Sequence, residues 1–274
     1  MQSAAPISLN DKINQLTESI RDKKRVAIAF SGGVDSTLLL YAAYRTLGDN
    51  AMAITVDAPY IPRWELDEAA DFCKKLKIRH TIIKLEIPAT IQNNPSDRCY
   101  HCKLALFKQL QNFADQNGAA LLDGTNYDDL DDYRPGMAAL KELAIQSPLL
   151  EAELTKSEIR QISKEWNLKT AGKPAYACLL TRIPHATQIT PEMLYRIEQA
   201  ETAIIKLGFP AVRVRHYADL ARIEIPTHQI PQAVAEPTRT KIVNAVRNAG
   251  YQFVTLDLAG YRMGSLNPAI EPAD

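Results

Sequence analysis

The sequence lacks an excess of charge of either sign, and it contains no long hydrophobic run. Lysine and arginine together number 32, as do aspartate and glutamate, so the formal net charge is zero. Neither half of the chain is strongly basic, and extended binding to nucleic acid therefore gets no support from bulk charge. No apolar run approaches the roughly 20 residues of a membrane helix, and the first six residues do not resemble a signal peptide.

Cysteine is also scarce, with four residues in a chain of 274. This number is too small for a disulfide scaffold in a protein of this length. We therefore expect a cytoplasmic protein in a reducing compartment, where spaced cysteines bind metals or take part in catalysis. The length is sufficient for one or two globular domains.

Short apolar runs alternate with segments of helical periodicity in the first half of the chain. The expected helices span residues 9–22, 37–47, 63–76 and 103–116, and the expected strands span residues 26–30, 51–56, 81–85 and 119–122. Strands that alternate with helices are typical of a parallel sheet covered by helices. The sequence therefore predicts an α/β domain with a parallel sheet, which we place at residues 1–185.

A smaller α+β domain is predicted at residues 186–274. It follows a helix that starts with a capping box of Thr155 and Glu158, and an aperiodic stretch over residues 167–190 that is typical of a functional loop. We expect the chain to be mobile from Leu266 onward. The expected elements of this domain are helices at 191–207 and 227–249 and strands at 211–214, 221–225 and 251–258.

A glycine-rich segment rich in hydroxyl groups connects the first expected strand to the next helix. It reads Ser31, Gly32, Gly33, Val34, Asp35, Ser36. The glycines leave backbone N–H groups open to an anion, and the helix N-terminus adds partial positive charge. Asp35 is a candidate ligand of Mg²⁺, which prefers oxygen atoms. The segment therefore predicts a site for the pyrophosphate of ATP.

This segment is not a Walker loop, because no lysine follows the glycines, and it is not a G-x-G-x-x-G motif. It resembles the signature of the PP-loop ATP pyrophosphatases, whose domain is adenine nucleotide alpha hydrolase-like. The resemblance implies cleavage of ATP between its α and β phosphates. Asp57 and the pair Asp123 and Gly124 follow expected strands, at the sheet edge where doubly wound folds bind ligands. An ordinary turn is the other interpretation of Asp123 and Gly124.

Three of the four cysteines are candidate metal ligands. Cys99 and Cys102 have C-x₂-C spacing ahead of the helix expected from Lys103, where a helix dipole lowers the pKa of a thiol. Cys178 lies in the aperiodic stretch, whereas Cys73 falls on an apolar helix face and is expected in the core. Three thiolates suit a [4Fe–4S] cluster with one open iron. A redox pair, or zinc with one histidine, remains an alternative. The candidate histidines are His101, His185 and His216.

Several later motifs, in this order, resemble those of the LarE-type ATP-dependent sulfur transferases of lactate racemase maturation. The resemblance covers residues 10–265. The motifs are Cys99-Tyr100-His101-Cys102-Lys103, Asp132-Tyr133-Arg134-Pro135-Gly136, Cys178-Leu179-Leu180-Thr181-Arg182-Ile183-Pro184, Val212-Arg213-Val214-Arg215 and Ala221-Arg222-Ile223-Glu224.

The resemblance implies that MgATP adenylates a carboxylate of pyridinium-3,5-biscarboxylic acid mononucleotide and that sulfur then gives a thiocarboxylate, which later receives nickel. One branch of the family sacrifices its own cysteine, at a position that here is Ala177. The sequence instead matches the branch whose three cysteines, here Cys99, Cys102 and Cys178, hold a [4Fe–4S] cluster that relays sulfide. The family also implies a homo-oligomer, a hexamer, and a separate sulfide donor as partner.

Arginines provide a candidate clamp for the phosphate of a mononucleotide. Arg213 and Arg215 are two residues apart in an expected strand and so point the same way, and Arg222 lies in the next strand. The guanidinium group matches phosphate oxygens, although arginines on an exposed strand face would look the same in sequence. Arg182, near Cys178, is a similar candidate catalytic residue. The roles of Asp131, Asp132 and His185 stay open.

Two other classes of enzyme share the pyrophosphate loop. A PP-loop tRNA thiolase would present a basic surface, which the balanced charge does not favour. An ammonia-using ligase such as NAD synthetase would need no set of three cysteines. A nucleotide sensor without turnover is the non-enzymatic alternative.

Overall fold

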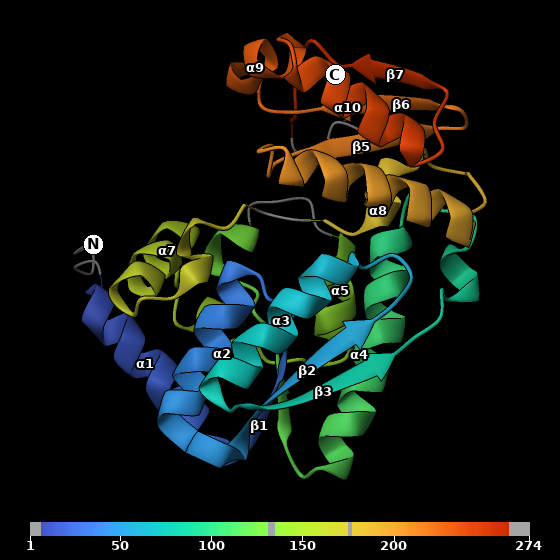
Figure 1. The fold of residues 1–274 in the computed structure, drawn as a ribbon. Coiled ribbons are helices and arrows are strands. Elements are labelled where there is room, and N and C mark those ends of the chain that lie inside the picture. Colours follow the sequence, from blue (N-terminus) through green and yellow to red (C-terminus); the bar gives the residue numbers. More distant parts are fainter. Residues whose placement is uncertain (1–6, 131–134, 175–176, 263–274) are drawn as a thin grey trace, which may run out of the picture. The chain divides into compact units, whose positions relative to one another are not determined.

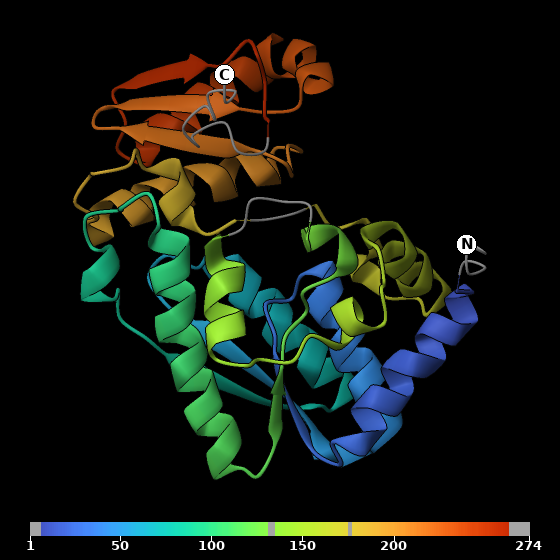
Figure 2. The same cartoon turned by 180° about the vertical axis from the view of Figure 1, so that it is seen from behind.

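The computed structural model describes residues 7–130, 135–174 and 177–262. The predicted mobile tail, Asp131 and Asp132 lie outside the described residues. The chain forms two compact units, which Figures 1 and 2 show from opposite sides. The first unit contains residues 1–91 and 97–176, and the second contains residues 92–96 and 177–274.

The first unit is built on a four-stranded parallel sheet with the order β3-β2-β1-β4. Its helices are α1 (Leu9–Asp22), α2 (Val34–Leu47), α3 (Arg63–Leu76), α4 (Arg98–Gln116), α5 (Pro135–Glu142), α6 (Pro148–Glu151) and α7 (Lys156–Glu165), with short 3₁₀ turns η1 (Gly48–Asn50), η2 (Ala89–Ile91), η3 (Tyr127–Leu130) and η4 (Lys169–Gly172). Its strands are β1 (Val26–Ala29), β2 (Ala51–Asp57), β3 (Arg79–Lys84) and β4 (Ala120–Leu122). The predicted parallel α/β sheet is thus confirmed.

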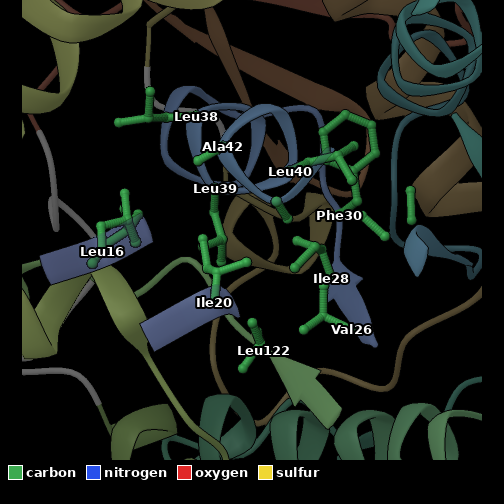
Figure 3. Close-up of a cluster of buried hydrophobic side chains, with 14 of the residues drawn as sticks. Leu16, Ile20, Val26, Ile28, Phe30, Leu38, Leu39, Leu40, Ala42 and Leu122 are labelled. Atoms are coloured by element: carbon green, nitrogen blue, oxygen red, sulfur yellow. The ribbon is translucent and has the colours of Figure 1, made fainter. Parts of the chain in front are cut away.

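The core of this unit explains the apolar character of β1 and α2. Val26 and Ile28 of β1 are fully buried, and so are Leu39 and Leu40 of α2. Figure 3 shows side chains of β1 and α2 gathered with Leu16 and Ile20 of α1 and Leu122 of β4. Each fully buried side chain of this size contributes about 1.5–3 kcal/mol. Burial therefore fixes β1 and α2, and with them the loop that joins the two elements.

The second unit consists of a three-stranded sheet and its helices. The elements are η5 (Leu179–Arg182), α8 (Pro191–Lys206), β5 (Arg213–Tyr217), β6 (Leu220–Glu224), η6 (Thr227–Gln229), α9 (Ile230–Val234), α10 (Thr238–Asn248) and β7 (Phe253–Leu256). β5 pairs antiparallel with β6, and β6 pairs parallel with β7. Its own core contains Phe209, Val214 and Val246, all fully buried. The smaller C-terminal part of strands and helices agrees with the predicted fold class.

Two boundaries differ from those expected from the sequence. α4 begins at Arg98, five residues before the predicted start, so the cysteine pair lies inside the helix. The first unit ends at residue 176, whereas the expected boundary was 185. Residues after 176 belong to the second unit because Arg182 pairs with Glu201 of α8 and Ile183 is buried. In the described part of the chain, no helix combines the length and the apolar character needed to cross a membrane.

Candidate active site

The pyrophosphate loop lies between β1 and α2, and its backbone is open to an anion. Gly33 is the N-cap of α2, and no side chain caps the helix there. The first N–H groups of a helix have no partner within the helix, and they carry the positive end of its dipole. Gly32 has φ of +70°, a left-handed conformation that favours glycine. The loop therefore has the geometry that binds phosphate at helix N-termini.

Two hydroxyl groups of the loop are close together. The Oγ atoms of Ser31 and Ser36 are 3.2 Å apart. The backbone N–H of Gly33 donates to Ser31 Oγ at 3.4 Å, and that of Ser31 donates to Ser36 Oγ at 3.4 Å. Because these contacts are long, both hydroxyl groups can turn toward a bound phosphate.

Asp35 faces a lysine and an amide from two other elements. Its carboxylate accepts a hydrogen bond from Lys156 Nζ at the start of α7 and a longer one, at 3.4 Å, from the side-chain amide of Asn126. About a fifth of the Asp35 side chain is exposed. An accessible carboxylate beside the phosphate loop can take a hard cation in place of the lysine.

Asp123, after β4, serves the local structure. Its side chain is buried. Its carboxylate accepts a hydrogen bond of 2.6 Å from Thr125 Oγ1 and another from the hydroxyl of Ser147. The next residue, Gly124, packs directly on the phosphate loop, since a Cβ there would lie 3.0 Å from the backbone nitrogen of Ser36. Asp57, at the end of β2, pairs with Arg63 of α3. The carboxyl ends of β1, β2 and β4 thus place the predicted residues at one edge of the sheet.

Lys173 is a residue of the loop environment that sequence reasoning missed. Its ammonium group donates to the carbonyl oxygen of Gly32 at 2.9 Å and to Glu68 Oε2 at 2.6 Å. It also lies 6.0 Å from the centre of the Trp64 ring. The segment around Lys173 is therefore tied to the pyrophosphate loop.

The four cysteines differ in environment. Cys73 is in the core, as predicted, and burial raises its pKa to about 12. Cys99 is exposed. Cys102 is half-buried, and its sulfur lies 3.3 Å from the Tyr60 hydroxyl. Burial is the main cause that raises the pKa of Cys102. The predicted lowering of that pKa at a helix start was wrong, because Cys102 lies in the second turn of α4 and is desolvated.

The third candidate ligand, Cys178, belongs to the second unit, where it precedes η5. Among the described residues, no group of three or more cysteine, histidine and acidic side chains is placed to hold a metal ion. Of the candidate histidines, His101 pairs with Asp97 at 3.0 Å. His216 is buried in the second unit and lies 3.1 Å from the Tyr251 hydroxyl.

Three of the candidate arginines, Arg182, Arg213 and Arg215, are buried, so the alternative of an exposed strand face does not apply to Arg213 and Arg215. Two of them, Arg182 and Arg215, form buried ion pairs. Arg182 makes two hydrogen bonds to Glu201, of 2.8 and 2.9 Å. Arg215 likewise contacts both oxygens of Glu224, at 2.9 and 2.6 Å. Glu201 was not predicted as a site residue, and Glu224 was named only as part of a motif and not as the partner of an arginine. Acidic partners at buried arginines could have been expected, because unpaired buried charge is costly.

The remaining two arginines complete the cluster. The guanidinium carbon of Arg213 lies 4.8 Å from the centre of the Tyr261 ring. Burial is the largest cause that lowers the pKa of Arg213, and repulsion from the charge of Arg182 lowers this pKa further. Arg222 contacts Glu224 at 3.1 Å and is about one third exposed. Arg182 also donates to the carbonyl oxygens of Ala177 and Cys178, at 2.7 and 3.1 Å. This arginine therefore holds the backbone that carries the third cysteine.

The chain is similar to known proteins over nearly its whole length. A family model described as a PP-loop domain matches residues 6–170. An uncharacterized protein of Synechocystis sp. is 42% identical over 94% of this chain and 98% of its own length. The pyridinium-3,5-bisthiocarboxylic acid mononucleotide synthase of Lactiplantibacillus plantarum is 34% identical over 97% of both chains. An uncharacterized protein of Methanocaldococcus jannaschii is 34% identical over 91% of this chain and 95% of its own.

Proposed function

The chain belongs to the LarE-type family of PP-loop enzymes, and from this premise we propose that it is an ATP-dependent sulfur transferase. Its substrate would be pyridinium-3,5-biscarboxylic acid mononucleotide, the compound whose bisthiocarboxylic form the Lactiplantibacillus relative is named for. The observation that carries the proposal is the uncapped N-terminus of α2 with the accessible carboxylate of Asp35 beside it.

The first step would be adenylation of the substrate. A carboxylate oxygen attacks the α-phosphorus of ATP, the bond between the α-phosphorus and the bridging oxygen breaks, and pyrophosphate leaves. The N–H groups of Gly33 and Val34 would hold the pyrophosphate, with Ser31 and Ser36 turned toward it. Mg²⁺ fits the oxygen atoms of Asp35, from which Lys156 would have to move. The positive groups balance the charge of the leaving pyrophosphate.

The second step would be sulfur transfer to the acyl adenylate. A sulfide attacks the activated carbonyl carbon, the acyl C–O bond breaks, and AMP leaves with the former carboxylate oxygen. Arg213, Arg215 and Arg222 would bind the phosphate of the mononucleotide. Binding there requires an exchange of partners, because Glu224 already contacts two of these arginines. Arg182 would position the backbone at Cys178.

Cys99, Cys102 and Cys178 would hold a [4Fe–4S] cluster, since soft thiolates are its usual ligands. Cys99 and Cys102 are three residues apart on α4, a spacing that places them on neighbouring positions of the helix surface. When bound, such a cluster supplies an open iron that holds sulfide. Ligation would require Cys102 to lose its proton, in spite of the burial that raises its pKa. We also propose a cytoplasmic homo-oligomer that receives sulfide from a separate donor.

The test is the release of AMP and pyrophosphate by protein purified without oxygen. We expect release only when ATP, Mg²⁺ and the biscarboxylic mononucleotide are all present, and a product in which sulfur replaces oxygen when sulfide is added. Asp35→Asn should abolish both. Release that depends on tRNA or ammonia would instead support the other PP-loop classes, and nucleotide binding without turnover would support a sensor.

A further inference from the structure

A pocket of about 630 Å³ lies in the first unit, between α2, α3 and η4 and beside the end of α7. Its size is within the range of small-molecule sites. It reaches Gly32 of the pyrophosphate loop, but most of its lining comes from parts of the three helices that the reaction above does not use. The lining residues include Phe30, Thr37, Tyr41, Phe72, Trp166 and Thr170.

Aromatic side chains form much of the wall. Tyr41 and Trp166 have ring centres 5.7 Å apart, and Phe30 and Phe72 have the same separation. Phe30 is buried, whereas the other three rings are half-buried. Rings at this separation are already paired, and their remaining faces and edges suit contact with another planar ring.

Two hydroxyl groups of the lining have no hydrogen-bond partner within the described residues. Thr37 is completely buried, and its Oγ1 atom is unpartnered, as is the buried Oγ1 atom of Thr170. A threonine of the same helix, Thr46, donates its hydroxyl to the carbonyl oxygen of Ala42 at 2.8 Å instead. A buried hydroxyl without a partner costs free energy. Two of them in one pocket therefore indicate polar atoms of a ligand.

The charged side chains of the lining are more often basic than acidic. Lys75 and Lys169 are exposed there, next to the exposed Asp71. Lys173 and Glu68 form the ion pair described above. Because Lys173 and Glu68 neutralise each other, the remaining charged residues of the lining are two lysines and one aspartate. This net positive charge favours an anionic group at the opening of the pocket.

We propose that this pocket binds a small planar heteroaromatic acid. The ring would lie among the aromatic side chains, with its ring nitrogen or a substituent bonded to Thr37 and Thr170, and the acidic group would contact Lys75 and Lys169. The pocket adjoins the pyrophosphate loop at Gly32 and Lys173, but the residues proposed to bind the acid lie outside that loop, and the proposal does not depend on the proposed sulfur transfer. Thr37 belongs to the first turn of α2, so an occupant would directly contact the helix that binds phosphate.

The experiment is a calorimetric titration of the full-length protein with pyridine-3-carboxylate, benzoate and pyridine-3-carboxamide. We expect saturable binding of pyridine-3-carboxylate and weaker binding of the other two, since benzoate lacks the ring nitrogen and the amide lacks the charge. Thr37→Val and Thr170→Val should each weaken binding by about three- to tenfold, the value of one hydrogen bond. Thr46→Val, at a hydroxyl outside the pocket, should not.

The titration is repeated with saturating ATP and Mg²⁺. Binding of the acid that persists supports a separate site, whereas displacement by ATP would assign the pocket to the nucleotide and overturn the proposal. Equal binding of all three compounds, no binding of any, or unchanged affinity in both valine variants would also overturn it. Valine has nearly the shape of threonine, and we expect Thr37→Val to keep the thermal stability because the hydroxyl it removes makes no hydrogen bond.

Discussion

The ammonium group of Lys173 lies 2.9 Å from the carbonyl oxygen of Gly32. The two residues are 141 positions apart in the chain, and the contact joins the stretch before Cys178 to the pyrophosphate loop. It fixes the peptide group that precedes Gly33, and so the direction of the N–H groups that follow. The lysine side chain is mostly buried, which limits its other positions.

Replacement of this lysine should loosen the loop. We expect Lys173→Met to raise the KM for ATP by about three- to tenfold, because it removes one hydrogen bond from a charged donor and keeps most of the packing. Steady-state kinetics with a pyrophosphate assay measures this. Lys164→Met, at an exposed position of α7, is the matched control. Equal effects of both variants would show that the contact has no specific role.

Gly124 should tolerate no side chain. A Cβ atom there would lie 3.0 Å from the nitrogen and 3.2 Å from the Cα of Ser36, so Gly124→Ala must displace the pyrophosphate loop. We expect ATP binding to fall at least tenfold, about 1.4 kcal/mol, while the far-ultraviolet circular dichroism stays unchanged. Gly172→Ala places its Cβ in open space and should bind ATP normally. Normal binding by Gly124→Ala would contradict the close approach.

The two thiols of α4 should differ in reactivity in metal-free protein, because Cys99 is exposed and Cys102 is half-buried. Burial raises the pKa of Cys102, so its thiol stays protonated, and unreactive, at pH values where an ordinary cysteine has begun to ionise. We expect iodoacetamide to modify the exposed Cys99 first and Cys102 only as the pH rises further, as followed by peptide mass spectrometry. Tyr60→Phe should raise the pH needed to modify Cys102 further, because the hydroxyl of Tyr60 lowers the pKa of Cys102. Modification of Cys102 before Cys99 would refute this order.

Removal of only one member of the buried ion pair of Arg215 and Glu224 should strongly lower the stability of the protein. Arg215→Met removes the arginine that contacts both carboxylate oxygens of the fully buried Glu224, and we expect a loss of about 3–5 kcal/mol in the free energy of unfolding. The double variant with Glu224→Leu should recover most of that loss, since it removes both buried charges. Urea unfolding of both variants tests this.

The same double variant also tests the proposed clamp. If Arg215 binds the phosphate of the mononucleotide, the folded double variant should bind ATP normally but bind the mononucleotide much more weakly. Normal affinity for both ligands would leave Arg215 with a structural role alone.

The sequence predicted the parts of the fold whose residues are buried in a regular pattern. β1 and β2 are apolar runs because both faces of a parallel sheet are covered, and α3 matched its expected bounds at Arg63 and Leu76. The start of α4 could not be found, because residues 98–103 are mostly polar and show no apolar period. Short helices such as α6, with four residues, also lack a period.

The candidate site was predictable where it is local in sequence. The pyrophosphate loop is one continuous segment, and the strand ends around it follow from the parallel sheet. Lys156 and Lys173 were not predictable, because each meets its partner across more than a hundred residues. Glu201 and Glu224 were not predicted as partners of the arginines, because an acidic residue in an amphipathic helix or a short strand is usually solvated.

The central claim is that the protein transfers sulfur repeatedly without consuming a cysteine of its own. Intact-mass spectrometry of the protein, after a reaction with ATP, Mg²⁺, sulfide and excess mononucleotide, tests this most directly. The account predicts several molecules of thiocarboxylate per protein chain and an unchanged protein mass, because the family resemblance implies that Ala177 occupies the position of the sacrificial cysteine. A single turnover, accompanied by loss of the mass of H₂S and a dehydroalanine at position 178, would contradict it.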